Sequence, residues 1–258
     1  MRNIVLDGNE RDELLATLGW WVEAGVDTLV DAAPRDWRTP PPRTAAREIP
    51  ASAPEPELVL RTGAASPANV TATTIAELRH AVEVFEGCPL RTGNVSTVFA
   101  DGNPEADLML IGEAPGAQED RVGLPFVGPA GQLLDRMLSA IGRNRTSAYI
   151  TNVTFWRPSG NRTPTPAEVE TTMPFVRRHI ALVRPKAIVA LGACAARALT
   201  GDVTGIMRLR GQWRTLAVEG ADYPLMPTLH PAFLLRQPDA KRLAWADLLA
   251  VKAKLDAD

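Results

Sequence analysis

The stretch GEAPGAQEDRVGLPFVGPAGQLL, residues 112–134, is the part of the chain around which the fold is organised. It follows the apolar run LMLI at residues 108–111, which is typical of a buried strand in a parallel sheet. The chain then turns at Pro115 and Gly116, and a helix is predicted from near Gly128. Open α/β sheets bind ligands where a strand feeds a glycine-rich turn and a helix. The sequence therefore predicts a ligand site here.

The residues of this turn do not suit a phosphate group. Glu113, Glu119 and Asp120 would repel a pyrophosphate, and the glycine spacings of dinucleotide and P-loop sites are both missing. Carboxylates beside an accessible aromatic residue, Phe126, suit a neutral planar ring and a positioned water instead. We expect an acidic, aromatic and catalytic site.

The remainder of the chain alternates strands with helices. After a first helix at 72–85, strands are predicted at 107–111, 148–153, 187–191 and 225–229, helices at 129–141, 166–183, 192–199 and 238–254, and a candidate edge strand near 212–218. Alternation of this kind favours a three-layer α/β/α fold with a central, mostly parallel four-stranded sheet.

Three segments differ in composition. Residues 1–32 have helical apolar spacing, and residues 33–70 are rich in proline and alanine, which is typical of a linker. Residues 71–258 carry the chemistry-bearing motifs and form the expected catalytic domain. We expect residues 1–70 to contact a protein partner.

Composition describes an ordinary globular protein, with 45% hydrophobic and 22% charged residues among 258. The sequence has no apolar run of membrane-spanning length and no signal-peptide pattern at its start. Two cysteines, Cys88 and Cys194, give no disulfide framework. We expect a cytoplasmic monomer without membrane association.

The net charge of −2 conceals an asymmetry. Residues 1–120 carry 9 Lys and Arg against 20 Asp and Glu (−11), whereas residues 121–258 carry 19 against 10 (+9). The basic half is compatible with a polyanion such as DNA, and equally with a solvated basic surface.

Four ordered blocks resemble the family-4 uracil-DNA glycosylases. They are GEAPG with ED and GLPFVGPAGQLL at 112–134, YITNVTFWRPSGNRTPTP at 149–166, RPKAIVALG at 184–192 and HPAFLLRQP at 230–238. The resemblance covers residues 88 to 250 approximately. It implies a DNA-repair enzyme that hydrolyses the N-glycosidic bond of uracil in DNA, single- or double-stranded, and leaves an abasic site.

The resemblance assigns roles to residues around the base. The Asn152 carboxamide accepts from uracil N3–H and donates to O4, whereas cytosine presents the opposite pattern; taken alone, Asn152 reads equally well as a loop cap. Phe126 stacks on the base, although most phenylalanines are simply core residues. His230 donates to O2 as negative charge develops, and Ala114 belongs to the uracil-binding set.

The three acidic residues of the turn are expected to have different roles. We expect Glu113 to position or activate the water, Glu119 to lie beside uracil C5 and exclude the thymine methyl group, and Asp120 to orient the loop. A cluster of acids also occurs in ordinary solvated turns.

The last block implies DNA contacts. Phe233, Leu234 and Leu235 are expected to wedge into the duplex where the base has left, with Arg236 on a phosphate. The alternative is that these residues form a buried helix start.

The chain departs from the family at the four cysteines that hold an iron–sulfur cluster. Cys88 remains, but Phe85, Trp156 and Met173 stand at the other three positions, and Cys194 matches none. A cubane cluster requires about four thiolates, so we expect no cluster and no metal, with the large side chains filling the space. The loop at 156–162 has no histidine, which disfavours a related branch that crosslinks itself to DNA.

Two other functions stay open. The same fold could act on other deaminated bases, hypoxanthine or xanthine, or serve as a non-catalytic DNA-binding or scaffold protein.

Overall fold

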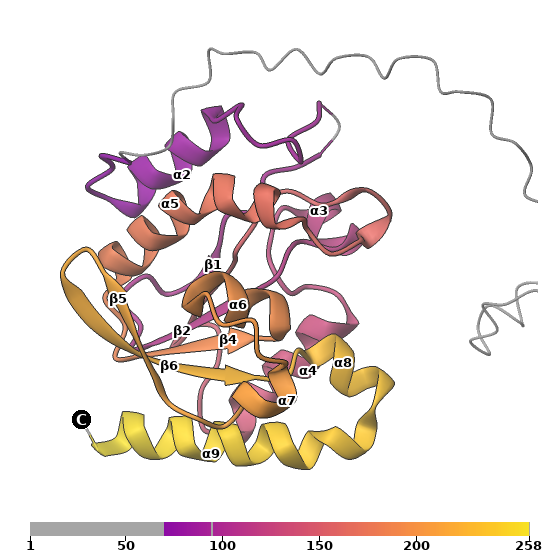
Figure 1. The fold of residues 1–258 in the computed structure, drawn as a ribbon, viewed down its shortest axis with the longest axis vertical. Coiled ribbons are helices and arrows are strands. Elements are labelled where there is room, and N and C mark those ends of the chain that lie inside the picture. The colour runs from indigo at the N-terminus through magenta and orange to yellow at the C-terminus, as the bar shows by residue number, and fades with distance from the viewer. Residues whose placement is uncertain (1–69, 94, 258) are drawn as a thin grey trace, which may run out of the picture. The chain divides into compact units, whose positions relative to one another are not determined.

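The structure, a computed structural model, describes residues 70–93 and 95–257 (Figure 1). The predicted helical segment at 1–32 and the linker, apart from Val70, lie outside the described residues. Within the described part, no helix is both long and apolar enough to cross a membrane.

A six-stranded sheet forms the centre, in the order β1-β3-β2-β4-β6-β5. The four inner strands, β3 (Tyr149–Asn152), β2 (Leu108–Gly112), β4 (Ala187–Leu191) and β6 (Ala221–Thr228), are parallel. The outer strands, β1 (Asp101–Gly102) and β5 (Arg214–Val218), pair antiparallel with β3 and β6. The predicted parallel core and the edge strand near 212–218 are confirmed; β1 was missed because two residues carry no periodicity.

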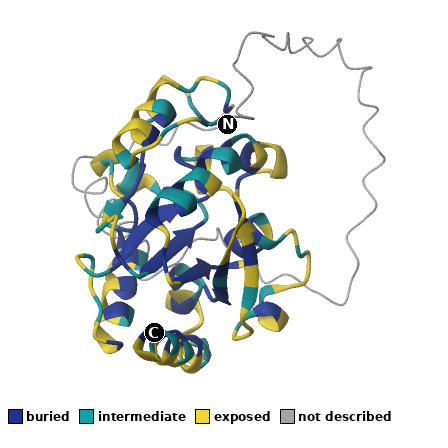
Figure 2. Cartoon of the chain, turned by 90° about the vertical axis from the view of Figure 1, so that its left-hand side faces the viewer, coloured by how far each residue is buried: buried dark blue, intermediate teal, exposed yellow. Residues whose placement is uncertain are grey.

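Helices cover both faces of the sheet, as Figure 1 shows. Met109 and Ile111 pack in the cluster that includes α2 (Ile75–Val84), α5 (Pro166–Val183) and α6 (Ala193–Thr200). Leu108 and Leu110 point to the opposite face, with α4 (Pro129–Ala140) and α9 (Lys241–Ala257). Because side chains alternate along a strand, these two clusters define the predicted three layers. Figure 2 shows the strands buried between helices whose outer sides are exposed.

Shorter helices complete the described chain. They are α3 (Ala117–Val122), η1 (Ser159–Asn161), α7 (Ile206–Leu209), α8 (Pro231–Arg236) and η2 (Pro238–Ala240). Helix α3 lies where the sequence suggested only a turn. It begins after Gly116 and ends at Gly123, whose φ of 79° is the left-handed conformation that glycine adopts at little cost.

Helix α5 begins with a capping box at Thr165. The Thr165 hydroxyl accepts from the Glu168 amide, and the Glu168 carboxylate accepts from the Thr165 amide at 2.7 Å. This reciprocal pair fixes where the loop after β3 ends. The carboxyl ends of the parallel strands consequently present Glu113, Asn152, Gly192 and His230 at one edge of the sheet.

Candidate active site

His230 stands between β6 and α8 with one ring nitrogen already engaged. As the N-cap of α8, its Nδ1 accepts from the Ala232 amide at 3.1 Å. In the neutral imidazole the proton must therefore reside on Nε2. Burial, helped by the charge of Arg236, lowers the pKa of His230 to about 4, against a smaller opposing effect of Glu119. The ring is thus a neutral donor at physiological pH.

Phe126 lies beside this histidine, with ring centroids 5.6 Å apart and planes inclined by 30°. It is buried, and its φ of 55° is an unusual backbone conformation for a residue with a side chain. Its ring covers Gly112: a Cβ added there would lie 2.5 Å from the Phe126 ring. The accessible aromatic residue expected from the sequence is thus only 6% exposed: Phe126 packs in the core cluster with Leu108 and Leu110, with its ring beside Gly112 and His230 at the strand ends.

Asn152 ends β3 directly opposite Gly112 of β2. Its side chain is buried, and its Oδ1 has no hydrogen-bond partner among the described residues. A Cβ on Gly112 would lie 2.4 Å from that oxygen, so glycine allows Asn152 and Phe126 to approach each other. A buried acceptor without a partner costs about 1–3 kcal/mol, which is typical of a group reserved for a ligand.

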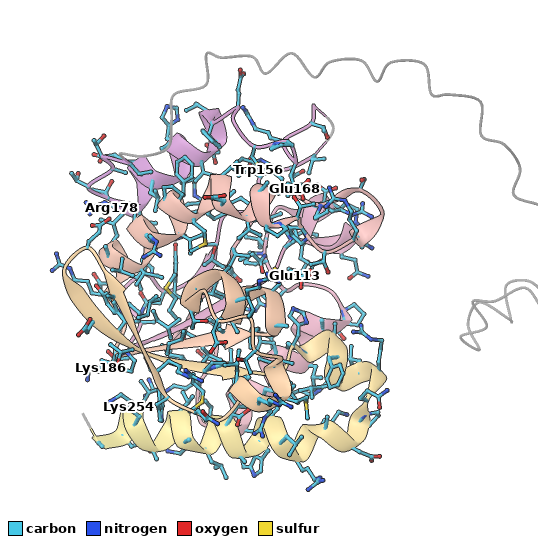
Figure 3. All side chains as sticks on the ribbon, in the orientation of Figure 1. Glu113, Trp156, Glu168, Arg178, Lys186 and Lys254 are labelled. Carbon is cyan, nitrogen blue, oxygen red and sulfur yellow. The ribbon has the colours of Figure 1, made fainter. Side chains whose placement is uncertain are left out.

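Glu113 follows Gly112 and is half-buried, as is Ala114. Burial raises the pKa of Glu113, and a hydrogen bond from the Thr163 side chain partly offsets that effect. Its backbone carbonyl accepts from the Thr154 amide at 3.2 Å, which ties the β2 end to the β3 end. Figure 3 marks Glu113 on the ribbon. Sequence reasoning missed Thr163, because nothing in its spacing relates it to Glu113.

The Glu119 carboxylate accepts hydrogen bonds from three backbone amides. Its Oε1 accepts from the amides of Val127 at 3.0 Å and Gly128 at 2.8 Å, and its Oε2 from Gly116 at 3.1 Å. These three bonds hold the loop between Gly116 and Gly128, and the expected position of Glu119 beside uracil C5 stays a prediction. Asp120 accepts from the Ser96 amide at 2.8 Å, in line with the loop-orienting role expected for it.

The residues of α8 that were expected to wedge into DNA differ in their exposure. Leu234 is only 1% exposed and packs in the cluster with Leu133 and Leu229, so its assignment to the wedge was wrong. Leu235 is 40% exposed, Phe233 is partly buried, and Arg236 is exposed. Successive helical residues lie about 100° apart, which explains why neighbours differ so strongly.

Aromatic side chains occupy the region where the cluster ligands of the family were expected. The Phe85 ring lies 6.4 Å from the Trp156 ring and 5.0 Å from the Phe175 ring. Cys88 is buried, with its Sγ 4.0 Å from the carbonyl oxygen of Glu168. Cys88, Trp156 and Phe85 thus belong to one apolar cluster.

Met173 packs against the same apolar cluster as Cys88, Trp156 and Phe85. It also lines a cleft of about 620 Å³ with Cys194, Arg197 and Val169. Thr172 is the neighbour that turns inward, and its hydroxyl donates to the Val153 carbonyl at 2.6 Å. Two cysteines do not supply the thiolates that a four-thiolate cluster needs.

No group of three or more His, Cys, Asp or Glu residues within the described ranges is arranged to hold a metal ion. Burial raises the pKa of the Cys194 thiol to about 12, so it stays protonated at neutral pH.

The Phe126 ring, the unpartnered Oδ1 of Asn152 and the neutral imidazole of His230 lie close together at the ends of the parallel strands. Residues 99–249 match the model of the uracil DNA glycosylase superfamily, and the chain belongs to that family. This confirms the resemblance seen in the sequence.

Curated relatives agree. The chain is 37% identical over 174 residues to a type-4 uracil-DNA glycosylase of Pyrobaculum aerophilum, an alignment that covers 64% of this chain and 86% of the relative. It is 39% identical over 158 residues to the enzyme of the same name from Archaeoglobus fulgidus, covering 60% and 79%. A third, from Thermotoga maritima, is 36% identical over 178 residues, covering 67% and 90%.

Proposed function

We propose that this protein excises uracil from DNA by hydrolysing the N-glycosidic bond, and that it leaves an abasic site. The observation that carries the proposal is the buried, unpartnered Oδ1 of Asn152 beside the Phe126 ring. A uracil stacked on Phe126 would supply the missing donor through N3–H. Catalysis belongs to residues 71–258, with residues 1–70 left for a protein partner.

Base selection follows from Asn152. Its carboxamide offers an acceptor and a donor, which complement N3–H and O4 of uracil. Cytosine presents an acceptor at N3 and a donor at N4, so both contacts would be mismatched in a buried site. Unpaired polar groups of this kind discriminate between substrates by orders of magnitude.

Bond cleavage leaves negative charge on the departing pyrimidine, and His230 is suited to meet it. Because the Ala232 amide occupies Nδ1, Nε2 carries the proton and donates to uracil O2 as the charge develops. Its lowered pKa favours a hydrogen bond from neutral imidazole over transfer of a proton. Selectivity for the transition state follows, because the charge exists mainly there.

Glu113 positions the attacking water. It follows the strand end that carries Gly112, and Thr163 and the Thr154 amide hold the segment in place. Burial raises its pKa, which makes the carboxylate a stronger base, and it can accept a proton from water as attack proceeds.

DNA binding is assigned to α8 and the basic half of the chain. Leu235 is the exposed apolar residue that would enter the space left by the base, and Arg236 next to it would meet a phosphate. We propose that the protein acts as a monomer on DNA.

We also propose that the enzyme works without an iron–sulfur cluster. Support comes from the two-cysteine composition and from the Phe85, Trp156 and Phe175 rings packed beside Cys88. Purified protein should contain no stoichiometric iron; about four irons per chain would overturn this part of the proposal.

The test of activity uses single- and double-stranded oligonucleotides with one uracil, hypoxanthine or xanthine. Alkali cleavage after incubation reveals abasic sites. We expect product from uracil only. Cleavage confined to the purine bases would replace this proposal with the other-base activity, and binding without cleavage would replace it with a scaffold role.

His230→Ala then tests the mechanism. The single-turnover rate should fall about 100-fold to 1000-fold, with DNA affinity nearly unchanged, because the lost donor acts in the transition state. The matched control is His80→Ala, since His80 is exposed on α2 and should be silent. A folded His230→Ala variant with a near wild-type rate would exclude the proposed role of His230.

A further inference from the structure

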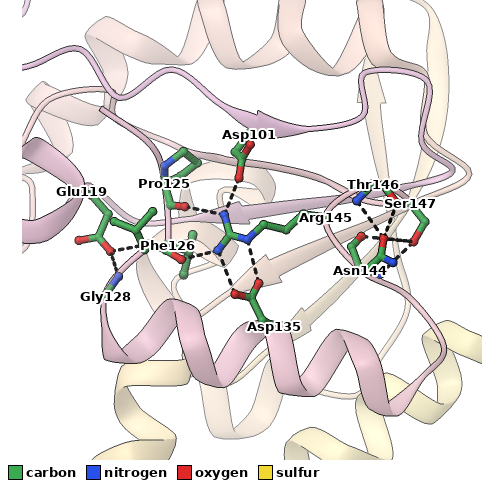
Figure 4. Close-up of polar contacts among 11 residues, drawn as sticks. Asp101, Glu119, Pro125, Phe126, Gly128, Asp135, Asn144, Arg145, Thr146 and Ser147 are labelled. Carbon is green, nitrogen blue, oxygen red and sulfur yellow. Dashed lines mark hydrogen bonds and ion pairs between the residues drawn. The ribbon is translucent and has the colours of Figure 1, made fainter. Parts of the chain in front are cut away.

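Arg145 lies in the connection between α4 and β3, and its guanidinium contacts the backbone at Pro125 and Phe126 (Figure 4). Nη1 donates to the Pro125 carbonyl at 3.1 Å, and Nη2 donates to the Phe126 carbonyl. Arg145 lies outside the four sequence blocks that resemble the family.

Two carboxylates hold the same guanidinium in place. Nη1 lies 2.6 Å from Oδ2 of Asp101 on edge strand β1, and Nε lies 2.9 Å from Oδ1 of Asp135 on α4. The loop before it is also closed, since Asn144 Oδ1 accepts from the Thr146 amide at 2.9 Å. Arg145 is therefore anchored to β1, α4 and its own turn before it reaches Phe126.

Phe126 requires such support. Its φ of 55° is unfavourable for a residue with a Cβ, at a typical cost of about 1–3 kcal/mol, and such conformations persist only when the surroundings enforce them. The peptide group between Phe126 and Val127 is held at both ends: Arg145 binds its carbonyl, and Glu119 binds its N–H at 3.0 Å. Rotation of that peptide would break a cationic and an anionic contact together.

We propose that Arg145 is a positioning residue for base excision, which fixes the strained Phe126 backbone so that the ring forms the stacking surface for the flipped base. The inference rests on the proposed function and deepens it. In this proposal the two-residue edge strand β1 orients the Arg145 guanidinium through Asp101; Arg145 and its contacts to Phe126 are called the clamp below.

Arginine suits this position in a way that lysine does not. A planar guanidinium presents several donors in fixed directions, and four acceptors surround it here. A lysine would keep the positive charge between Asp101 and Asp135 but could not reach both carbonyls in the same geometry.

The experiment compares Arg145→Lys and Arg145→Ala with wild type in single-turnover excision, DNA affinity and thermal unfolding. We expect Arg145→Lys to retain most of the melting temperature and DNA affinity yet to lose about 100-fold in rate, the cost of misplacing a reacting group by about 1 Å. Arg145→Ala should lose both rate and stability. If Arg145→Lys restores rate and stability together, the residue only neutralises the two carboxylates and the proposal is wrong.

A double-mutant cycle shows whether the effect passes through Phe126. Phe126→Ala and the pair Phe126→Ala with Arg145→Lys should have the same rate within about twofold, because the clamp has nothing left to position. Additive losses would refute the inference. Arg178→Lys is the control: Arg178 also binds a carbonyl (Ala72, 2.6 Å) and a carboxylate (Glu219, 2.6 Å), at the other end of α5 from Glu168 (Figure 3). It should leave the rate unchanged.

Hydrogen exchange separates this inference from the proposed function. In Arg145→Lys the Val127 amide should exchange at least about tenfold faster than in wild type, since opening of the loop no longer breaks two contacts. If wild type removes no uracil, the proposed function fails, and this exchange still decides whether Arg145 holds the peptide. Unchanged exchange refutes the clamp in either case.

Discussion

Gly131→Ala should disable the site through a single methyl group. Gly131 lies in the first turn of α4, and an added Cβ would sit 1.6 Å from the Phe126 carbonyl oxygen and 2.1 Å from its carbonyl carbon. Real Cβ contacts essentially never fall below 3.0 Å, so the carbonyl would have to retreat by at least 1.4 Å (3.0 less 1.6). That movement withdraws Phe126 from Arg145 and turns the stacking ring away from Asn152.

Two effects of Gly131→Ala on the free energy of unfolding oppose each other, and the destabilising steric overlap is the larger. Alanine in a helix interior gains about 1 kcal/mol over glycine. Overpacking costs about 1–3 kcal/mol, and a lost hydrogen bond to a charged group costs about 1.5–3 kcal/mol. We expect a net loss of about 2–4 kcal/mol in the free energy of unfolding, together with a loss in rate of about 100-fold.

Urea unfolding and single-turnover excision measure the two effects. Gly93→Ala is the control, because nothing lies within 4 Å of the position of its added Cβ, and it should stay within about 0.5 kcal/mol of wild type. If Gly131→Ala were as stable as wild type and equally fast, the close approach of α4 to Phe126 would have no role in catalysis.

Three further predictions concern other parts of the site. Burial lowers the pKa values of His179 and His230 to about 3 and about 4, so both contribute stability above pH 6.5 that is lost as pH falls towards 4. His230→Gln should reduce the fall in the free energy of unfolding between pH 7 and pH 5 by about 2 kcal/mol, measured by urea unfolding. An unchanged fall would contradict a neutral His230. Asn152→Asp should suppress uracil excision, because carboxylate oxygen repels O4, and admit cytosine weakly; a folded variant with an unaltered uracil rate would remove Asn152 from base recognition. Glu119→Gln weakens three backbone contacts and should slow excision without admitting thymine, so measurable thymine release would support the methyl-excluding role.

The sequence by itself determined the four inner strands, the edge strand near 212–218 and the longer helices. Apolar runs of four or five residues and the caps around Thr165 are local signals, because hydrophobic spacing and capping act within a few residues of chain. Asn152 and His230 could be placed at one sheet edge for the same reason: both directly follow parallel strands.

Only the tertiary structure decided what those side chains meet. The Glu119 carboxylate holds the loop because its Oε1 accepts from the amides of Val127 and Gly128, eight and nine residues away in sequence. Leu234 proved to be core because α8 turns it towards Leu133, while Leu235 next to it faces outward.

Arg145 shows the reason most clearly. Its partners come from β1, from the loop before α4 and from α4 itself, up to 44 residues away in sequence. Spacing along a chain records which residues share a helix or strand face, whereas convergence of distant carbonyls and carboxylates on one guanidinium depends on how the layers pack. The sequence therefore determined the elements and the reacting groups, and packing decided how the surface beneath the base is held in place.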